Sequence, residues 1–349
     1  MSGTYKVTGI NLKSIPLGES DRLLTVLTPD QGLIRAVAPG ARKHKSSLRG
    51  RSSLFAVNEL FIAKGRSLDK IIQAEGLESF PNLSQDLGKL TASQYLAEVA
   101  LFQALSQQPQ TELFALVCEH LRRLVKQPQS LTLACLVHAV FHLLIVAGLA
   151  PQVQVCCVTQ QPVVPDFSNR DWRIGFSAAA GGTVQLSELD RLASEGYAKP
   201  RSKNWDYSSP SGNGELGTGN VAGINEAIAI SKYAGTGRHR YSDQPEQRPR
   251  HSAQSKISEL CILLTATELA LLQQLANPHL PQLDGEPNGV DLIGGDKVSS
   301  NLSPNSAESV GVWLSIERTL RHYAQYHLER PIRSATLIET CFTPLLQSS

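Results

Sequence analysis

The stretch from Gly32 to Arg51, GLIRAVAPGARKHKSSLRGR, gathers positively charged side chains at high density. Between Gln31 and Asn58 there are six Lys or Arg residues and no Asp or Glu: Arg35, Arg42, Lys43, Lys45, Arg49 and Arg51. The whole chain has a formal net charge of only +2, so this run creates a local field. Cations at this density attract a polyanion and gain free energy from the release of its counterions. The run therefore predicts phosphate contacts, and a solvated surface loop is the alternative.

Two other groups of residues have side chains that bind metals in proteins. His138 and His142 are spaced for one helical face, but no third ligand is near in sequence, so hydrogen-bonded core histidines are the better interpretation. Cys156 and Cys157 are adjacent, whereas structural zinc takes cysteine pairs at C-x₂₋₄-C spacing, twice. The sequence contains no P-loop, GxSxG elbow or HExxH motif. We therefore expect no metal ion or other cofactor, and a protein that is not an enzyme.

The basic run lies within a segment that reads as short strands separated by turn signals, a pattern typical of a small barrel or sandwich. The expected strands are Tyr5–Leu12, Arg22–Thr28, Leu33–Ala38, Leu54–Ala63 and Asp69–Glu75. An OB-type barrel is the five-stranded architecture most used on oligonucleotides, so the cations would extend from such a barrel.

Beyond Pro81 the apolar residues recur at helical period. The expected helices are Thr91–Gln107, starting with a capping-box spacing, Thr111–Lys126, Leu131–Gly148, Lys256–Gln274 and Glu308–Glu329. The segment Leu131–Ala150 is long and apolar, but its two histidines favour a core helix over a membrane span. The six cysteines show no disulfide framework, and the N-terminus has no apolar signal core, so we expect a reduced, cytoplasmic protein.

The predicted fold class is therefore α+β and multidomain, with an OB-type barrel followed by a helical bundle. The expected divisions are a barrel at 1–80, a helical domain in two parts at 81–150 and 256–349, a small lobe at 151–199, a disordered insertion at 200–255 and a flexible linker at 277–308. The insertion is rich in Ser, Gly, Pro and Arg, and so it buries little apolar surface.

Several stretches together resemble the RecO family of bacterial recombination mediators. The block GINLKSIPLGESDRLLTVLTPDQGLIRAVAPGARKHKSSLRGRSSLFAVNEL is similar to the family's N-terminal signature, "GE.D.LLT.LT...GL" followed by "A.GARK.KS.LRG". The order of an apolar helix, a cysteine-containing hairpin and a late helix reading RHYAQYHLER is also similar. The resemblance covers residues 1–199, 256–276 and 309–342.

The resemblance implies an N-terminal OB fold, a helical domain and a zinc-finger-like lobe. It implies binding to single- and double-stranded DNA, annealing of complementary strands, and loading of the RecA recombinase onto protein-coated single strands. The implied partners are RecR and the acidic C-terminal tail of single-stranded-DNA-binding protein. No association with a membrane is implied. The implied place of action is the bacterial nucleoid in the cytoplasm.

Many members of the family carry two CxxC pairs in the lobe, and this chain departs from that pattern. Cys157 matches the first ligand, but Gln160 stands where the second would be. The other pair would fall in Thr183–Leu186, which contains no Cys. We therefore expect a degenerate lobe without zinc, although metal binding would have supplied much of the stability of such a lobe.

The last helix and its exit supply a second candidate DNA-contacting surface, made of Arg318, Arg321, Arg330 and Arg333. A solvated helical face is the alternative interpretation of these arginines. For the protein as a whole, the alternative is an interaction adaptor that docks an acidic protein tail and does not bind DNA. A third interpretation is an RNA-binding barrel, because a surface that contacts only phosphates discriminates poorly between RNA and DNA.

Overall fold

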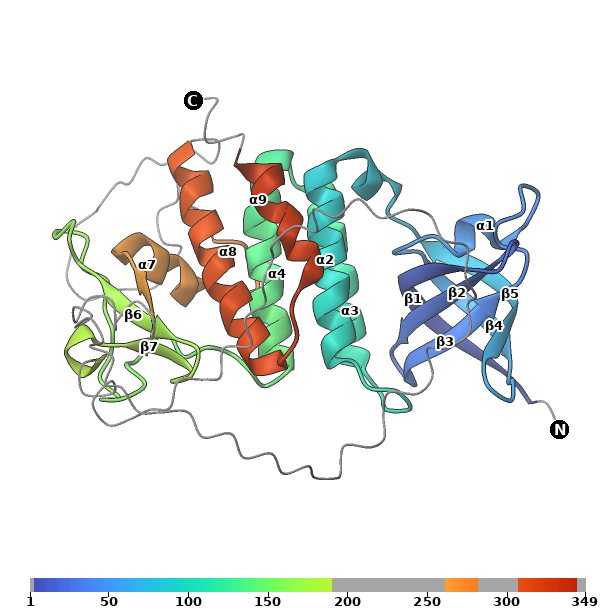
Figure 1. Cartoon of the computed structure of the whole chain (residues 1–349), viewed down its shortest axis with the longest axis horizontal. Coiled ribbons are helices and arrows are strands. Elements are labelled where there is room, and N and C mark those ends of the chain that lie inside the picture. Colours follow the sequence, from blue (N-terminus) through green and yellow to red (C-terminus); the bar gives the residue numbers. More distant parts are fainter. Residues whose placement is uncertain (1–2, 190–260, 282–306, 344–349) are drawn as a thin grey trace, which may run out of the picture.

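The computed structural model describes residues 3–189, 261–281 and 307–343. Figure 1 shows a barrel at one end of the molecule, a bundle of helices in the middle and a small sheet at the other end. The predicted insertion at 200–255 and most of the predicted linker at 277–308 lie outside the described residues. The α+β class, with a barrel followed by helices, is as the sequence predicts.

The first five strands close into a barrel in the order β1-β2-β3-β5-β4. They are β1 (Thr4–Leu17), β2 (Asp21–Thr28), β3 (Gly32–Ala38), β4 (Val57–Ala63) and β5 (Asp69–Glu78). Every neighbouring pair is antiparallel except β3 and β5, which run parallel and close the barrel. The predicted OB-type barrel is thus confirmed, with β1 and β5 longer than the expected strands.

Alternation along the strands divides their side chains between the barrel interior and its outer surface. The interior is filled by aliphatic residues: Val7, Leu24, Val26, Ala36, Ala38, Leu60, Ile62 and Ile71. The register pairs Ile10 with Leu27 and Leu27 with Leu33 on the outer surface. These three residues join the core of the helical domain, so one outer side of the barrel is covered.

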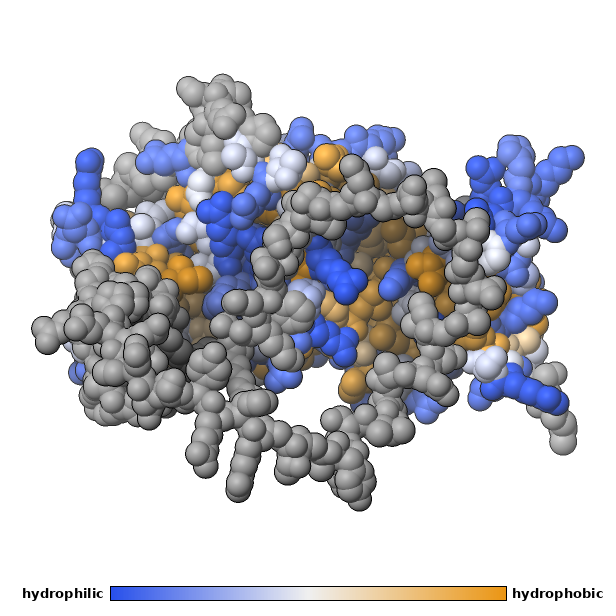
Figure 2. Space-filling model, in the orientation of Figure 1, coloured by the Kyte–Doolittle hydropathy of each residue, from blue (hydrophilic) through white to orange (hydrophobic). Residues whose placement is uncertain are grey.

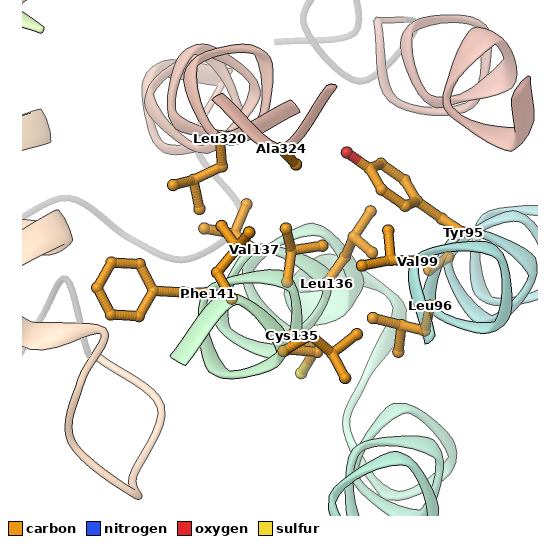
Figure 3. Packing of buried hydrophobic residues seen from close by; sticks show 14 of the residues in the cluster. Tyr95, Leu96, Val99, Cys135, Leu136, Val137, Phe141, Leu320 and Ala324 are labelled. Atoms are coloured by element: carbon orange, nitrogen blue, oxygen red, sulfur yellow. The ribbon is translucent and has the colours of Figure 1, made fainter. Parts of the chain in front are cut away.

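The helical domain is built around α4 (Thr132–Val146), which is buried on almost every side. It packs against α2 (Leu87–Gln103), α3 (Thr111–Lys126) and α8 (Ala307–Leu328), and the short α9 (Thr336–Phe342) packs on α2 and α8. Figure 3 shows how α2, α4 and α8 bring their apolar side chains together in this core: Tyr95, Leu96, Val99, Cys135, Leu136, Val137, Phe141, Leu320 and Ala324. By length and composition the α4 region passes as a membrane span, but 67% of that window is buried inside the protein, as in a core helix.

The start of α2 differs from the sequence prediction. The carboxylate of Asp86 accepts a hydrogen bond from the Lys89 backbone N–H and caps the helix there, so Thr91 lies buried inside α2 instead of capping it. The helix ends at Gln103 because the following residues are extended and pair with the barrel. The predicted capping box at Thr91 was therefore wrong.

The lobe contains a three-stranded sheet in the order β7-β6-β8, made of β7 (Gly182–Val184), β6 (Ile174–Ser177) and β8 (Ile262–Leu264). The strand β8 falls inside the range predicted as one helix, Lys256–Gln274, so that prediction was wrong for residues 262–264. A capping box between Thr265 and Glu268 begins helix α7 (Ala266–Gln274) only after this strand. The lobe sheet therefore combines residues from both sides of the insertion.

The turn between β2 and β3 is joined to the linker between α2 and α3 by backbone hydrogen bonds. The Leu33 N–H donates to the Leu105 carbonyl at 2.9 Å, and the Gln107 N–H donates to the Gln31 carbonyl at 2.9 Å. Gly32 has φ of +65°, and a Cβ added there would lie 2.0 Å from the Leu105 oxygen. Only glycine allows this approach, so the junction fixes the barrel against the bundle.

Candidate nucleic-acid interface

The basic loop, residues 39–51, lies across the end of the barrel and is fixed there by two apolar side chains. Ala41 and Leu48 belong to the barrel core, and Leu48 begins the short helix α1 (Leu48–Arg51). The cations between these two anchors project outward, and hydrophilic colour covers the end of the barrel that carries α1 (Figures 1 and 2). The sequence thus holds this loop by its apolar residues and exposes its charged ones.

The hairpin between β1 and β2 holds the beginning of the loop. Asp21 accepts a hydrogen bond from the Gly40 N–H at 2.8 Å, and the Arg42 guanidinium donates to the Gly18 carbonyl at 2.7 Å. The Gly40 bond, a bond from Ser20 and the charges of Lys43 and Lys70 keep the pKa of the Asp21 carboxyl below its usual value. Arg42 and Asp21 therefore join the hairpin and the loop into one unit.

The end of the loop is fixed by polar contacts. The side-chain amides of Asn11 and Asn58 both donate to the Arg51 carbonyl, at 2.7 and 2.9 Å. The Arg51 guanidinium lies over Gly76 of β5, where an added Cβ would be 2.2 Å from Nη1. Arg51 and Arg42 thus both make contacts within the fold, although the sequence nominated them only for DNA contact.

Four of the cations nominated in the barrel are exposed and have no side-chain hydrogen bond within the described structure: Arg35, Lys43, Lys45 and Arg49. Among the described residues, none of these side chains forms an ion pair. The strand register adds two exposed lysines that the sequence reasoning missed, since Lys13 and Arg35 both pair with Thr25 of β2, and Lys70 pairs with Val37. Only the alternation of β1 signals Lys13, and no linear pattern signals Lys70.

The arginines of the second candidate surface have partners within the helical domain. Arg318 and Arg321 both pair with Glu339 of α9, at 3.0 and 3.2 Å. Arg330 lies over the ring of Phe102, 5.5 Å from its centroid. Arg333 is exposed, with its backbone N–H donating to Glu98. These contacts limit the free cationic surface of α8, and DNA contact by these four residues stays a prediction.

Arg321 also pairs with the buried carboxylate of Glu317, at 3.4 Å. Glu317 is 2% exposed, and its burial raises the pKa of the carboxyl to about 7, although the charge of Arg321 acts in the opposite direction. Arg321 therefore joins α8 to α9 within the fold rather than pointing freely to solvent.

His138 and His142 are hydrogen-bonded core histidines, as predicted, and His120 of α3 joins them. The Nε2 atoms of His138 and His142 contact the carbonyls of Asn277 and Leu275, at 2.8 and 2.9 Å, just after α7. His142 Nδ1 lies 3.3 Å from His120 Nε2. Burial lowers the pKa of His138 to about 4 and that of His120 to about 2. The three rings thus dock the end of α7 on α3 and α4.

The lobe presents a donor set that does not fit a four-coordinate zinc ion. The sulfur facing the segment after β7 is that of Cys156, not Cys157, and it accepts a hydrogen bond from the Gln185 N–H at 3.4 Å. The side-chain amide of Gln160 donates to the Cys157 carbonyl at 3.0 Å. In the described part of the chain there is no group of three or more His, Cys, Asp or Glu residues arranged for a metal. The turn around Cys156 and Gln160 thus carries thiol, hydroxyl and amide side chains in place of the four Cys or His ligands of a structural zinc site.

Comparison with known families gives two matches along the chain. A model described as "Recombination protein O N terminal" matches residues 1–80, and one described as "Recombination protein O C terminal" matches residues 84–189. The first of these covers the barrel and its basic loop, and the second covers α2, α3 and α4 and the lobe strands β6 and β7.

Several known proteins are similar to this chain along almost their whole length. A protein of Nostoc sp. called DNA repair protein RecO is 47% identical over 98% of this chain and 97% of its own length. Proteins with the same name from Cyanothece sp. and Trichodesmium erythraeum are 48% and 41% identical, and each match covers at least 98% of both chains.

Proposed function

The chain belongs to the RecO family of DNA repair proteins, and on that basis we propose that its barrel binds the phosphate backbone of single- and double-stranded DNA. The observation that carries the proposal is the set of exposed cations without ion-pair partners in the described structure, on the basic loop and on the neighbouring strands. Backbone contacts of this kind position a protein on DNA without reading its sequence.

Annealing of complementary strands follows from the same electrostatics. Two DNA strands repel each other through their phosphates, and a protein that neutralises part of that charge lowers the repulsion. Because the basic loop is anchored at both ends, its backbone keeps its arrangement when a strand binds, and little backbone ordering entropy is lost. We infer that the protein promotes annealing without catalysing a covalent step.

The test is the salt dependence of binding, measured by fluorescence anisotropy with a labelled single strand. The variant Lys43→Ala/Lys45→Ala removes two free cations and keeps Arg42, which holds the loop. The slope of log K against log salt is negative, and each lost phosphate contact makes it shallower by about 0.7 for single strands. We therefore expect the slope of the variant to be shallower by about 1.4. Weaker binding with the smaller slope supports the proposal.

A control with the same change in charge uses Lys126 and Arg170, both exposed and outside the barrel. The Lys126→Ala/Arg170→Ala variant should bind DNA as the unmodified protein does. Equal affinities and equal slopes in both variants would contradict the assignment to the basic loop. Annealing of complementary oligonucleotides, followed in parallel, should slow only in the loop variant.

We further propose that the helical domain contacts protein partners, namely RecR and the acidic tail of single-stranded-DNA-binding protein, and that the protein thereby helps RecA to load onto coated strands. The family membership supports this, and so do the exposed Arg330 and Arg333 at the end of α8, since an acidic tail pairs with cations. The place of action would be the nucleoid in the cytoplasm. The donor set of the lobe supports a fold that is independent of zinc.

A further inference from the structure

The outer face of β1, β2 and β3 carries an apolar strip beside its cations. The strand register aligns Ile15 of β1 with Leu23 of β2, and Leu23 with Val37 of β3. Leu17 lies two residues beyond Ile15 and therefore projects from the same face. These four residues, Ile15, Leu17, Leu23 and Val37, are called the apolar strip below.

The apolar strip belongs to neither hydrophobic core. The side chains that fill the barrel come from the alternate positions of β2 and β3, and the core of the helical domain includes none of the four residues. Ile15 and Leu17 are 40% and 37% exposed, whereas Leu23 is only 6% exposed, so Ile15 and Leu17 form the accessible part of the strip. A single exposed aliphatic residue is ordinary, but a contiguous group on one face indicates a contact surface.

Cations border the strip on two sides. The preceding row across the same strands is Lys13, Thr25 and Arg35, which lies about 7 Å away, two residues along the strands. Lys70 of β5 pairs beside Val37 at the other end of the strip. Two carboxylates lie at this edge: Asp21, in register with Leu17, is held by the Gly40 N–H, and Glu19 is exposed in the turn that follows Leu17. The strip thus lies within a positive field.

A nucleic-acid strand matches this arrangement, because each nucleotide offers an anionic phosphate and, one sugar away, the apolar face of a base. Barrels that bind single strands usually stack bases on aromatic side chains, but residues 12–38 contain no aromatic residue. Aliphatic side chains serve the same purpose in proteins that insert Leu or Ile against unstacked bases. In a duplex the base faces are stacked and out of reach.

The hairpin that carries the exposed half of the strip is already fixed to the basic loop. Arg42 donates to the carbonyl of Gly18, the residue after Leu17, and Ser20 accepts a hydrogen bond from the backbone N–H of Arg42 at 2.8 Å. The apolar contact and the phosphate contacts are therefore parts of one preformed surface, which lowers the cost of binding.

We infer that the apolar strip contacts the faces of unstacked bases and gives the barrel a preference for single-stranded over double-stranded DNA. This inference rests on the proposed DNA binding at the same face. The cations supply the part of the affinity that depends on salt, and the strip supplies a part that does not.

The experiment uses the full chain with three ligands of equal length: an oligothymidylate, a strand of the same backbone with abasic sites, and a duplex. The variant is Ile15→Ser/Leu17→Ser, in which both changed side chains are exposed and outside the cores. We expect it to bind oligothymidylate about tenfold more weakly at every salt concentration, with an unchanged salt slope. Its affinities for the abasic strand and the duplex should stay those of the unmodified protein.

The matched control is Leu77→Ser on β5, a residue that is 56% exposed and outside the strip, and it should leave all three affinities unchanged. A complementary variant, Leu17→Trp, adds an aromatic ring at the tip of the strip and should tighten binding to oligothymidylate but not to the abasic strand. Equal affinity of the unmodified protein for oligothymidylate and the abasic strand would overturn the inference, and so would a serine variant that binds oligothymidylate normally.

Failure of the inference and failure of the proposed DNA binding give different results. If the unmodified protein binds none of the three ligands, the proposed function itself is wrong. If it binds all three with a steep salt slope that Lys43→Ala/Lys45→Ala reduces, while Ile15→Ser/Leu17→Ser changes nothing, then only the base contact is refuted.

Discussion

The histidines that dock the end of α7 should make part of the stability depend on pH. His138 Nε2 lies 2.8 Å from the Asn277 carbonyl and Nδ1 lies 2.6 Å from Arg123 Nη1, so the neutral ring donates at Nε2 and accepts at Nδ1. A proton on Nδ1 would face the guanidinium. Burial is the main cause that lowers the pKa of His138 to about 4, and the charges of His142, Arg123 and His279 add to it.

The sign and the size follow from linkage. The unfolded histidine, with its ordinary pKa of about 6.5, takes up a proton at a higher pH than the folded one. The contribution of His138 to the free energy of unfolding is therefore fully present at neutral pH and is lost as the pH falls below about 6.5. With the folded pKa at about 4, His138 alone contributes about 2 kcal/mol less at about pH 5 than at pH 7.5.

The assay is denaturant unfolding of the wild type and of His138→Gln, which does not titrate, at both values of pH. Comparison of the two proteins is needed because Glu317, with its raised pKa, makes the wild type less stable as the pH rises and so opposes the effect of His138. The free-energy difference between wild type and variant should shrink by about 2 kcal/mol between about pH 7.5 and pH 5. A difference that stays constant would refute the reasoning.

Three further predictions concern single contacts in the fold. Relative to wild type, Glu317→Gln should gain about 2 to 3 kcal/mol in free energy of unfolding between about pH 5 and about pH 8, because the buried wild-type carboxylate becomes charged over this range, as checked by denaturant unfolding. Glu98→Ala removes acceptors used by the Ser334 N–H and hydroxyl, and should lower the melting temperature through a loss of about 1 to 2 kcal/mol without changing DNA affinity. Gly32→Ala should cost at least about 2 kcal/mol, since its Cβ would meet the Leu105 oxygen, and a stability like that of wild type in thermal unfolding would contradict the tight junction.

Periodicity and turn signals in the sequence predict most of the fold, because the spacing of apolar residues within a long amphipathic segment indicates its secondary structure. The helix Thr111–Lys126 has the predicted bounds, and the last helix differs by one residue at each end. The strand at Ile262–Leu264 was missed because a three-residue apolar run has no period of its own, and its identity depends on pairing with β6. The start of α2 was misplaced because Asp86, outside the expected helix, provides the cap.

The candidate interface was predicted in part. The density of cations identifies the basic loop, since charge is a property of sequence. Which of the cations are free depends on the fold: Arg42 and Arg51 are engaged with Gly18 and Gly76, far away in sequence. Lys70 comes beside Val37 only through the parallel pairing of β3 with β5, which no local pattern encodes.

The joined turn and linker between barrel and bundle have a mechanical consequence. Backbone hydrogen bonds from Leu33 and Gln107, together with the close approach at Gly32, restrict rotation of the barrel relative to the helical domain. When a DNA strand bound to the barrel moves, the helical domain would therefore move with it as one rigid body. Twisting or bending of that strand would turn the helical surface by the same angle, so that the orientation of one bound molecule dictates the approach direction of the other.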